Sequence, residues 1–232
     1  MPRIRIQERA SVSDDFVELY RRTAETKLRF ELNKIKSMSR EFARTYMLQS
    51  PSKFGRLGAI VKGHNGPGVG MDFEKARLRS LDYQRFFTLE HRGEMYFCGQ
   101  TRDVVMEEYG GASKCVARWD IGSYTIYVPV RTLLSVKPDL IHMVPDRSPL
   151  TASRHPHHRA GYDGDHPLDR FPYTCWSQFA TPVSIAVSEV NLVELFRFLR
   201  TFVGRYNNRS PLTNIDHNFM WRINPDENRA RT

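Results

Sequence analysis

The spacing of apolar side chains changes along the chain, and each spacing predicts a different kind of structure. From Ser13 to about Gln49 apolar residues recur at helical intervals, which predicts one long amphipathic helix. Five residues form its expected apolar stripe: Leu28, Leu32, Ile35, Phe42 and Tyr46. Ser11 or Ser13 is placed to cap the start of this helix through its hydroxyl, and Pro51 ends the pattern.

Short runs rich in β-branched and aromatic residues predict a meander of strands further along the chain. Four such runs are separated by short turn sequences: RFFTLEH, EMYFCG, KCVARWDI and YTIYVPV. In the last run Tyr124, Ile126 and Val128 alternate with the residues between them, as in a strand that buries one face. LIHMVP, residues 140–145, is a further candidate strand.

A second helix is expected from about 189 to 207, after an irregular stretch between Asp146 and Tyr173. Seven residues form its expected apolar face: Leu192, Leu195, Phe196, Leu199, Phe202, Val203 and Tyr206. Asn191 and Glu194 have the spacing of a capping box. Three arginines are expected to face solvent or a partner: Arg197, Arg200 and Arg205. The order of helix, strands, long loop and helix predicts an α+β fold, an antiparallel meander flanked by an N-terminal and a C-terminal helix.

The positive charge of the chain is concentrated near its N-terminal end. The formal net charge is +9, and residues 1–62 hold 14 Lys and Arg against 7 Asp and Glu, which leaves 21 against 19 elsewhere. A basic arm of this kind can contact nucleic acid or an acidic partner, with residues 21–62 as the contact region. The acids interspersed through it favour the simpler interpretation of a solvated helix face.

Cysteine use and hydropathy indicate the compartment. The three cysteines, Cys98, Cys115 and Cys175, are odd in number and widely spaced, which argues against a disulfide framework. No apolar run approaches the length of a membrane span, and the N-terminus lacks the apolar stretch of a secretory signal. We therefore expect a cytoplasmic protein without membrane contact.

Candidate chemistry gathers between residues 153 and 179, where four of the eight histidines and one of the three cysteines occur. Five side chains there are possible zinc ligands: His155, His157, His158, His166 and Cys175. Their spacing does not match the usual C-x2-C or H-x3-5-H pairs of structural zinc sites. A nucleophilic cysteine needs partial exposure and an electropositive or hydrogen-bonding environment, and Cys175 suits this better than the two cysteines on predicted strands. The third possibility is a structural turn that inserts Thr174-Cys175-Trp176 into the core.

The order of these features resembles the ubiquitin-conjugating enzyme (UBC-like) superfamily, and in particular its prokaryotic and phage-type branch. That family carries a His-Pro-Asn motif shortly before its active cysteine, and bacterial relatives often have His-Pro-His, as at His155-Pro156-His157. Residues 182–212, which end in Pro211-Leu212, resemble the stretch that follows the cysteine. Two departures stand out: Cys175 lies 18 positions after His157, and residues 50–114 have no clear counterpart.

The resemblance implies a UBC-like fold with an insertion, and thioester transfer through Cys175 from an activating enzyme to an amine. His157 would support the loop and stabilise the oxyanion, and His155 would be structural. Asp163 would organise the incoming amine, or it is a turn former. No cofactor is implied, and the partners are a ubiquitin-like protein and its activating enzyme. Because the superfamily contains members without a working cysteine, the alternatives are a non-catalytic assembly subunit, for example of a viral particle, and a nucleic-acid-associated protein.

Four segments follow from this interpretation. Residues 1–50 form the basic N-terminal helical arm, and residues 51–114 form an insertion with short strands and the glycine-rich loop GHNGPGVG. That loop lacks the Gly-Lys-Ser/Thr ending of a phosphate-binding loop. Residues 115–215 form the UBC-like core with the Cys175 loop and the C-terminal helix, and residues 216–232 form a tail.

Overall fold

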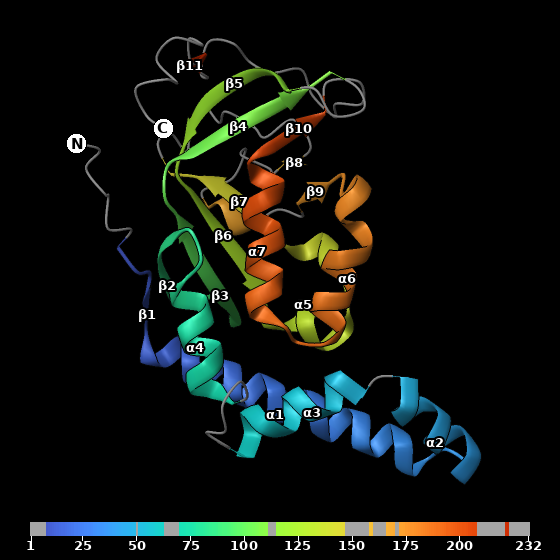
Figure 1. Cartoon of the computed structure of the whole chain (residues 1–232). Coiled ribbons are helices and arrows are strands. Elements are labelled where there is room, and N and C mark those ends of the chain that lie inside the picture. The colour runs from blue at the N-terminus through green and yellow to red at the C-terminus, as the bar shows by residue number, and fades with distance from the viewer. Residues whose placement is uncertain are drawn as a thin grey trace, which may run out of the picture.

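The computed structural model describes residues 8–49, 51–62, 70–110, 115–146, 158–159, 166–169, 172–207 and 221–222. Within these residues the protein is a mixed α+β structure with seven α-helices and a mostly antiparallel main sheet (Figure 1). These observations confirm the predicted α+β class and the predicted antiparallel meander. Among the described helices, none combines the length and the apolar character that crossing a membrane requires.

The helices and strands have the following bounds. The α-helices are α1 (Asp14–Lys36), α2 (Arg40–Gln49), α3 (Pro51–Lys62), α4 (Met71–Arg79), α5 (Val130–Ser135), α6 (Ala180–Ser188) and α7 (Leu192–Val203). Single 3-10 turns are η1 (Pro138–Leu140), η2 (Pro167–Asp169) and η3 (Ser177–Phe179). The strands are β1 (Ser11–Val12), β2 (Tyr83–His91), β3 (Glu94–Thr101), β4 (Val104–Tyr109), β5 (Cys115–Gly122), β6 (Tyr124–Pro129), β7 (His142–Pro145), β8 (His158–Arg159), β9 (Tyr173–Thr174), β10 (Arg205–Asn207) and β11 (Trp221–Arg222).

The main sheet has the strand order β1-β2-β3-β6-β7, in which β2, β3, β6 and β7 form an antiparallel meander. The β4–β5 hairpin leaves this meander and joins a second sheet of order β10-β4-β5-β11. Arg92 and Gly93 connect β2 to β3 with φ angles of 51° and 76°. Positive φ at both positions matches the tight hairpin turn whose twist suits the strands.

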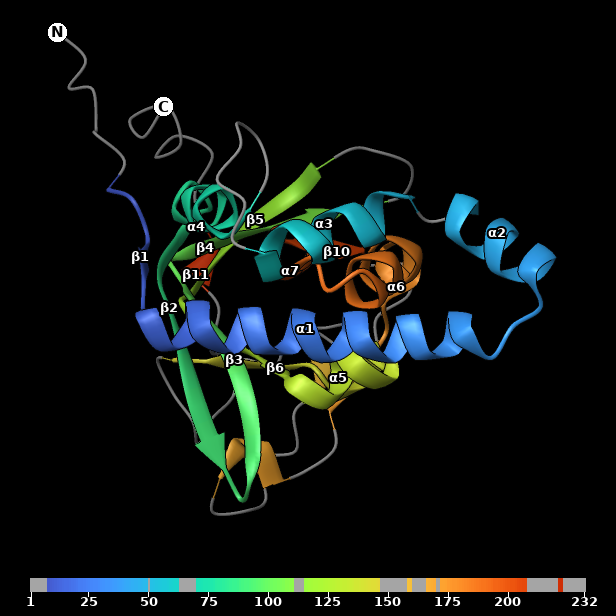
Figure 2. The same cartoon turned by 90° about the horizontal axis from the view of Figure 1, so that it is seen from below.

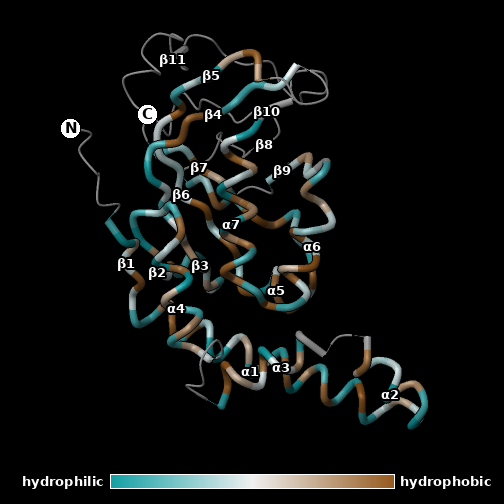
Figure 3. Tube along the Cα trace, viewed as in Figure 1, coloured by the Kyte–Doolittle hydropathy of each residue, from teal (hydrophilic) through white to brown (hydrophobic). Residues whose placement is uncertain are grey.

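One face of the meander packs against α1 and α7. Cross-strand pairing places Phe86, Gly99, Ile126 and Met143 in one row on this face. Phe196 of α7 lies against this row, with its ring 5.1 Å from that of Phe86. A Cβ on Gly99 would come within 2.8 Å of Phe196, so the glycine permits the close approach of α7. Figure 3 shows the hydrophobic positions along α6, α7 and the strands they cover.

The opposite face of the meander carries a second row, Phe87, Cys98, Tyr127 and His142. Leu168 of η2 packs in a separate small core with Tyr96 and Cys98 on this face. The segment around η2 therefore covers the side of the sheet that faces away from α1 and α7. This packing brings part of the histidine-rich loop against the meander.

The single helix expected over residues 13–49 is instead two helices. Ser13 caps α1 as predicted, because its hydroxyl accepts from the Phe16 amide at 3.2 Å. The chain turns after Lys36, and the Ser39 hydroxyl accepts from the Phe42 amide at the start of α2. Serine side chains bond readily to nearby backbone groups, which favours such a break.

The expected apolar stripe of this region is wrong at two positions. Leu32 and Phe42 are 43% and 72% exposed, because α2 and the end of α1 project away from the sheet (Figure 2). The buried side of α1 here carries Lys27 and Glu31, and Glu31 accepts from Lys53 of α3 at 2.6 Å. An ionic cluster thus replaces the expected apolar contact between α1 and its neighbours.

Several other predictions need correction. Within the segment 51–114, helices α3 and α4 were not predicted, and Pro51 begins α3, a position that proline favours. The predicted glycine-rich loop at 63–70 falls between these two helices and, apart from Gly70, lies outside the described residues. Strand β4 and helix α6 had no clear sequence signal. Helix α7 ends at Val203 rather than near 207, and β10 follows it and pairs with β4.

The apolar face of α7 is confirmed where the prediction was most specific. Leu195, Leu199 and Phe202 are buried, and Asn191 caps the helix by accepting from the Glu194 amide at 3.2 Å. Arg197 and Arg205 are exposed as expected. The expectation for Arg200 is wrong, because its side chain is only 19% exposed and is paired with Asp82.

Candidate functional site

Cys175 lies between β9 and η3, immediately before the stretch of helix that η3 and α6 form. Its neighbours Thr174 and Trp176 are buried, while Cys175 itself is partly exposed and free of any disulfide. Trp176 packs against Phe202 of α7 with ring centroids 5.2 Å apart. The core therefore fixes the backbone on the C-terminal side of Cys175 and leaves the thiol partly accessible.

The other two cysteines are in different environments. Cys98 is fully buried in the middle of β3, and burial raises the pKa of its thiol well above the usual range. Cys115 lies at the start of β5, where its sulfur is 3.4 Å from the Ala117 carbonyl oxygen. Cys98 is thus the buried hydrophobe that the strand pattern predicts, whereas Cys115 is half-buried.

Strands β8 and β9 form a short antiparallel ribbon next to Cys175. Their register pairs His158 with Thr174 and Arg159 with Tyr173. His158 directly follows His157 in the chain, and Thr174 directly precedes Cys175. The ribbon therefore brings the two segments that carry the His-Pro-His motif and the candidate nucleophile together, although 16 positions separate the paired His158 and Thr174. His155, His157 and Asp163 themselves lie outside the described residues.

His166 belongs to a different cluster, at the tip of the β2–β3 hairpin. Its ring stacks on that of His91 with centroids 4.1 Å apart, and its Nδ1 accepts from the Leu168 amide at 3.2 Å. Burial, and next the nearby His91, lowers the pKa of His166. His166 therefore acts as a packing and turn-forming residue among the described contacts.

Asp169 fastens the same segment to the hairpin. Its carboxylate oxygens lie 2.6 Å from His91 Nε2 and 2.9 Å from an Arg92 terminal nitrogen. The hydrogen bond to His91 lowers the pKa of Asp169, and the charge of Arg92 acts in the same direction. Because Asp169 lies between His157 and Cys175 in the chain, this contact ties the long loop to the sheet.

His142 completes the attachment from β7. It is 3% exposed, and its ring lies 6.4 Å from that of Tyr96. Burial lowers the pKa of His142 to about 4, with further lowering by Arg131, His166 and His91, while a hydrogen bond with the Pro167 backbone opposes the shift. Its Nδ1 has no hydrogen-bond partner among the described residues. His142 is therefore a neutral histidine that contacts the backbone of η2.

The zinc alternative receives no support from the described part of the chain. Within the described residues, no three His, Cys, Asp or Glu side chains gather in a way that could hold a metal ion. His166 contacts the ring of His91 and the amide of Leu168, whereas Cys175 lies next to the β8–β9 ribbon. Two of the proposed ligands, His155 and His157, are outside the described residues.

Sequence reasoning missed the residues that hold the loop. His91, Arg92 and His142 lie in strands or turns far along the chain from Asp169, and each looks like an ordinary strand or turn residue in the sequence. The one local signal was the tight turn at Arg92-Gly93, which predicts an exposed hairpin tip but does not identify its contact.

Comparison with known proteins gives no match: no family model, no curated protein and no solved structure is significantly similar to this chain. The function is therefore inferred from the site and the fold.

Proposed function

We propose that the protein is a cysteine transferase of the ubiquitin-conjugating type, in which Cys175 carries a ubiquitin-like modifier as a thioester. The observation that carries this proposal is the β8–β9 pairing, which joins the backbone next to His157 to the backbone next to Cys175. This pairing of the residue after the motif with the residue before Cys175 supports the proposal that the motif and the thiol form one loop-built site.

The order of elements gives further support. A helix precedes a four-stranded antiparallel meander, and the meander is followed by the loop, the cysteine, a 3-10 turn and helices α6 and α7. This order matches the resemblance if α1 is taken as the first helix and if β2 and β3, which lie in the segment 51–114 that the sequence analysis treats as an insertion, are counted in the core sheet. The β4–β5 hairpin is an addition between the second and third strands of the meander.

The proposed reaction has two balanced steps. The thiolate of Cys175 attacks the carbonyl carbon of a modifier held as a thioester on an activating enzyme. The new C–S bond to Cys175 forms, the old C–S bond breaks, and the activating enzyme leaves as its thiolate. An acceptor amine then attacks the same carbonyl, loses a proton to solvent, and releases the Cys175 thiolate.

The surrounding residues have proposed roles in this reaction. His157 donates a hydrogen bond to the oxyanion that forms at the carbonyl. His155 supports the loop, and Asp163 orients the amine. The contacts of Asp169 with His91 and Arg92 hold the segment 166–169, which lies between His157 and Cys175 in the chain, against the β2–β3 hairpin.

The first test measures thiol reactivity. Wild-type protein is treated with iodoacetamide, and the alkylation rate of each cysteine is read by peptide mass spectrometry. Cys175 should react much faster than the buried Cys98, and faster at higher pH, because the thiolate is the reacting species. Equal rates at Cys175 and Cys98 in the folded protein would reject the proposal.

The second test uses a synthetic thioester of ubiquitin with a small thiol as the donor. The expected product is an adduct on Cys175 that dithiothreitol removes. Cys175→Ala should abolish the adduct, whereas the matched variant Cys115→Ala should keep it. His157→Ala should slow adduct formation, because attack on the thioester carbonyl forms an oxyanion. The same variant should leave the iodoacetamide rate of Cys175 unchanged, because alkylation forms no oxyanion. Equal adduct formation in wild type and Cys175→Ala would count against the proposal.

A second candidate function, nucleic-acid binding, is favoured by the end of α1 and by α2, which project away from the sheet, together with the neighbouring α3. Residues 21–62 hold 11 Lys and Arg against 3 Asp and Glu. Phe30 and Phe42 are 60% and 72% exposed there, and Figure 3 shows hydrophobic positions on α2 away from the sheet. Cations beside exposed aromatic rings suit single-stranded nucleic acid. Salt-dependent binding of an oligonucleotide that weakens in Arg44→Gln would support this function, and it requires no reactive cysteine.

A further inference from the structure

A row of three charged side chains crosses the second sheet. Strand pairing places Glu107 of β4 opposite Arg205 of β10 on one side and opposite Arg118 of β5 on the other. Residues that are paired in a sheet project from the same face. One glutamate therefore lies between two arginines on one face of the sheet.

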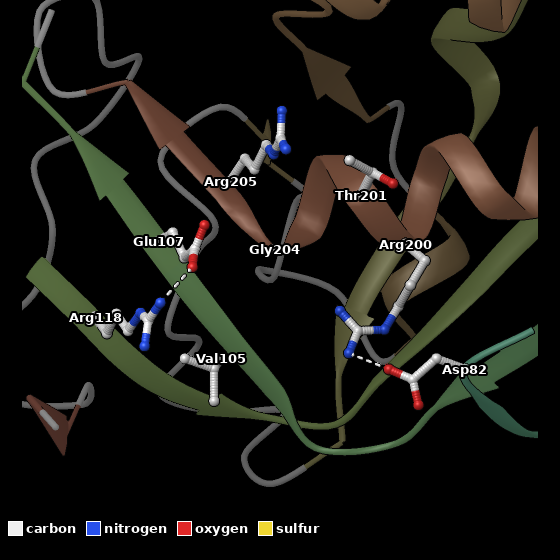
Figure 4. A pocket seen from close by; sticks show the side chains of 8 residues that line it. All are labelled: Asp82, Val105, Glu107, Arg118, Arg200, Thr201, Gly204 and Arg205. Atoms are coloured by element: carbon white, nitrogen blue, oxygen red, sulfur yellow. Dashed lines mark hydrogen bonds and ion pairs between the residues drawn. The ribbon is translucent and has the colours of Figure 1, made fainter. Parts of the chain in front are cut away.

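Helix α7 brings a third arginine to the same place. Arg200, Thr201 and Gly204 of its last turn line a hollow of about 490 Å³, together with Asp82, Val105 and the charged row (Figure 4). The volume lies within the range of pockets that hold small ligands. In Figure 4 the guanidinium of Arg200 lies between Asp82 and the hollow.

Both carboxylates at the hollow are already engaged. Glu107 accepts from Arg118 at 3.1 Å through one oxygen and from the Tyr109 hydroxyl through the other. Asp82 accepts from Arg200 at 2.5 Å and lies 3.9 Å from Arg102. These ion pairs hold Arg118 and Arg200 in place without using all their N–H groups, since a guanidinium has five.

Arg205 has no carboxylate partner among the described residues. Its guanidinium carbon lies 5.8 Å from the centroid of the Tyr109 ring. Arg200 adds a donor, because its Nε is buried and has no hydrogen-bond partner in the described part of the chain. The lining residues thus carry three cations against two neutralised carboxylates, which leaves an excess positive charge and free donors.

We propose that this hollow binds the phosphate group of a small phosphorylated ligand of about nucleotide size. A phosphate presents several oxygens and up to two negative charges, so it can accept from more than one guanidinium group at the hollow, which a single carboxylate does less well. The two ion pairs hold two of the three guanidinium groups before the ligand arrives, which reduces the entropy lost on binding. This site is separate from Cys175, and it does not depend on the thiol chemistry proposed above.

Calorimetric titration of the full chain with pyrophosphate tests the proposal. AMP and ADP form a second arm, and a single-stranded oligonucleotide without terminal phosphates forms a third. Saturable binding of pyrophosphate or of the nucleotides is expected. Arg205→Gln should weaken it about tenfold or more, as expected for the loss of one charge-assisted contact.

Arg197→Gln is the matched control. Arg197 also lies on α7, but it is 57% exposed and pairs with Glu194 away from the hollow. This variant should bind pyrophosphate like the wild type. Arg118→Gln provides a second variant from another strand, and circular dichroism checks that each variant is folded.

Three results would overturn the proposal. The first is no saturable binding of pyrophosphate or nucleotides up to about 10 mM, a concentration that would reveal even millimolar affinity. The second is equal weakening by Arg197→Gln and Arg205→Gln, which would indicate a general effect of positive charge. The third is binding of the oligonucleotide alone, which would assign the arginines to a nucleic-acid backbone.

Discussion

Low pH should weaken the contact by which His142 of β7 holds the η2 segment, which precedes Cys175 in the chain, against the sheet. This histidine is buried on β7 beside Tyr96 and contacts the Pro167 backbone, so protonation would place a charge in an apolar site. The charged groups that act on it, Arg131, His166 and His91, also disfavour its protonation. In the folded protein its pKa is about 4, compared with 6.5 for an ordinary histidine.

The sign and size of the effect follow from these two values. Above pH 7 both the folded and the unfolded chain hold a neutral His142, and its contribution to stability is fully present. As the pH falls below 6.5 the unfolded chain takes up a proton and the folded chain does not, so the free energy of unfolding decreases until the pH reaches about 4. Between pH 7 and pH 5 this amounts to about 2 kcal/mol for His142 alone.

Urea unfolding at pH 7 and pH 5 measures this difference. His142→Gln retains a side-chain hydrogen-bond donor but cannot titrate, so its loss of stability between the two pH values should be about 2 kcal/mol smaller than that of the wild type. Tyr96→Phe is the control, because it disturbs the same packing without removing a group that titrates below pH 7. If His142→Gln and the wild type lose the same stability, His142 is not held neutral by burial and the reasoning is wrong.

Two further predictions concern the helices. Glu31→Ala should destabilise the protein by about 3–5 kcal/mol in urea unfolding, because Lys27 and Lys53 would stay buried without their carboxylate; an exposed pair removed by Glu25→Ala should cost under about 1 kcal/mol, and similar costs for the two variants would contradict the burial argument. Leu199→Ala should lower stability by about 2–5 kcal/mol through the cavity it leaves in the core of α7, and a variant that unfolds like the wild type would show that this face is assigned wrongly.

The elements that the sequence predicts well are those whose signal is local. Tyr124, Ile126 and Val128 alternate because successive side chains of β6 point to opposite faces of the sheet, and this period is visible within six residues, although both faces are covered and only Tyr127 is half-buried. Asn191 and Ser13 cap helices through contacts three residues away, so spacing identifies Asn191 and narrows the first cap to Ser11 or Ser13. The apolar face of α7 is likewise a property of one continuous segment.

The predictions of buried and exposed residues fail where contacts with distant parts of the chain decide the burial. Leu32 and Phe42 have helical spacing but no surface to pack on, because the end of α1 and α2 lie beyond the sheet, and Glu31 is buried because Lys53 reaches it from another helix. Arg200 resembles a solvent-facing arginine until Asp82, from the turn before β2, is placed beside it. Neither partner can be identified from local spacing.

In the candidate site, too, some features follow from the local sequence and others depend on contacts between distant segments. The sequence alone determined that Cys175 is the loop cysteine and that histidines gather before it. Only the tertiary structure separated those histidines, since the β8–β9 register draws His158 to the Cys175 side while stacking on His91 takes His166 to the hairpin tip. The physical reason is that periodicity and capping depend on neighbours within a few residues, whereas strand register, ion pairing and burial depend on which distant segment fills the space.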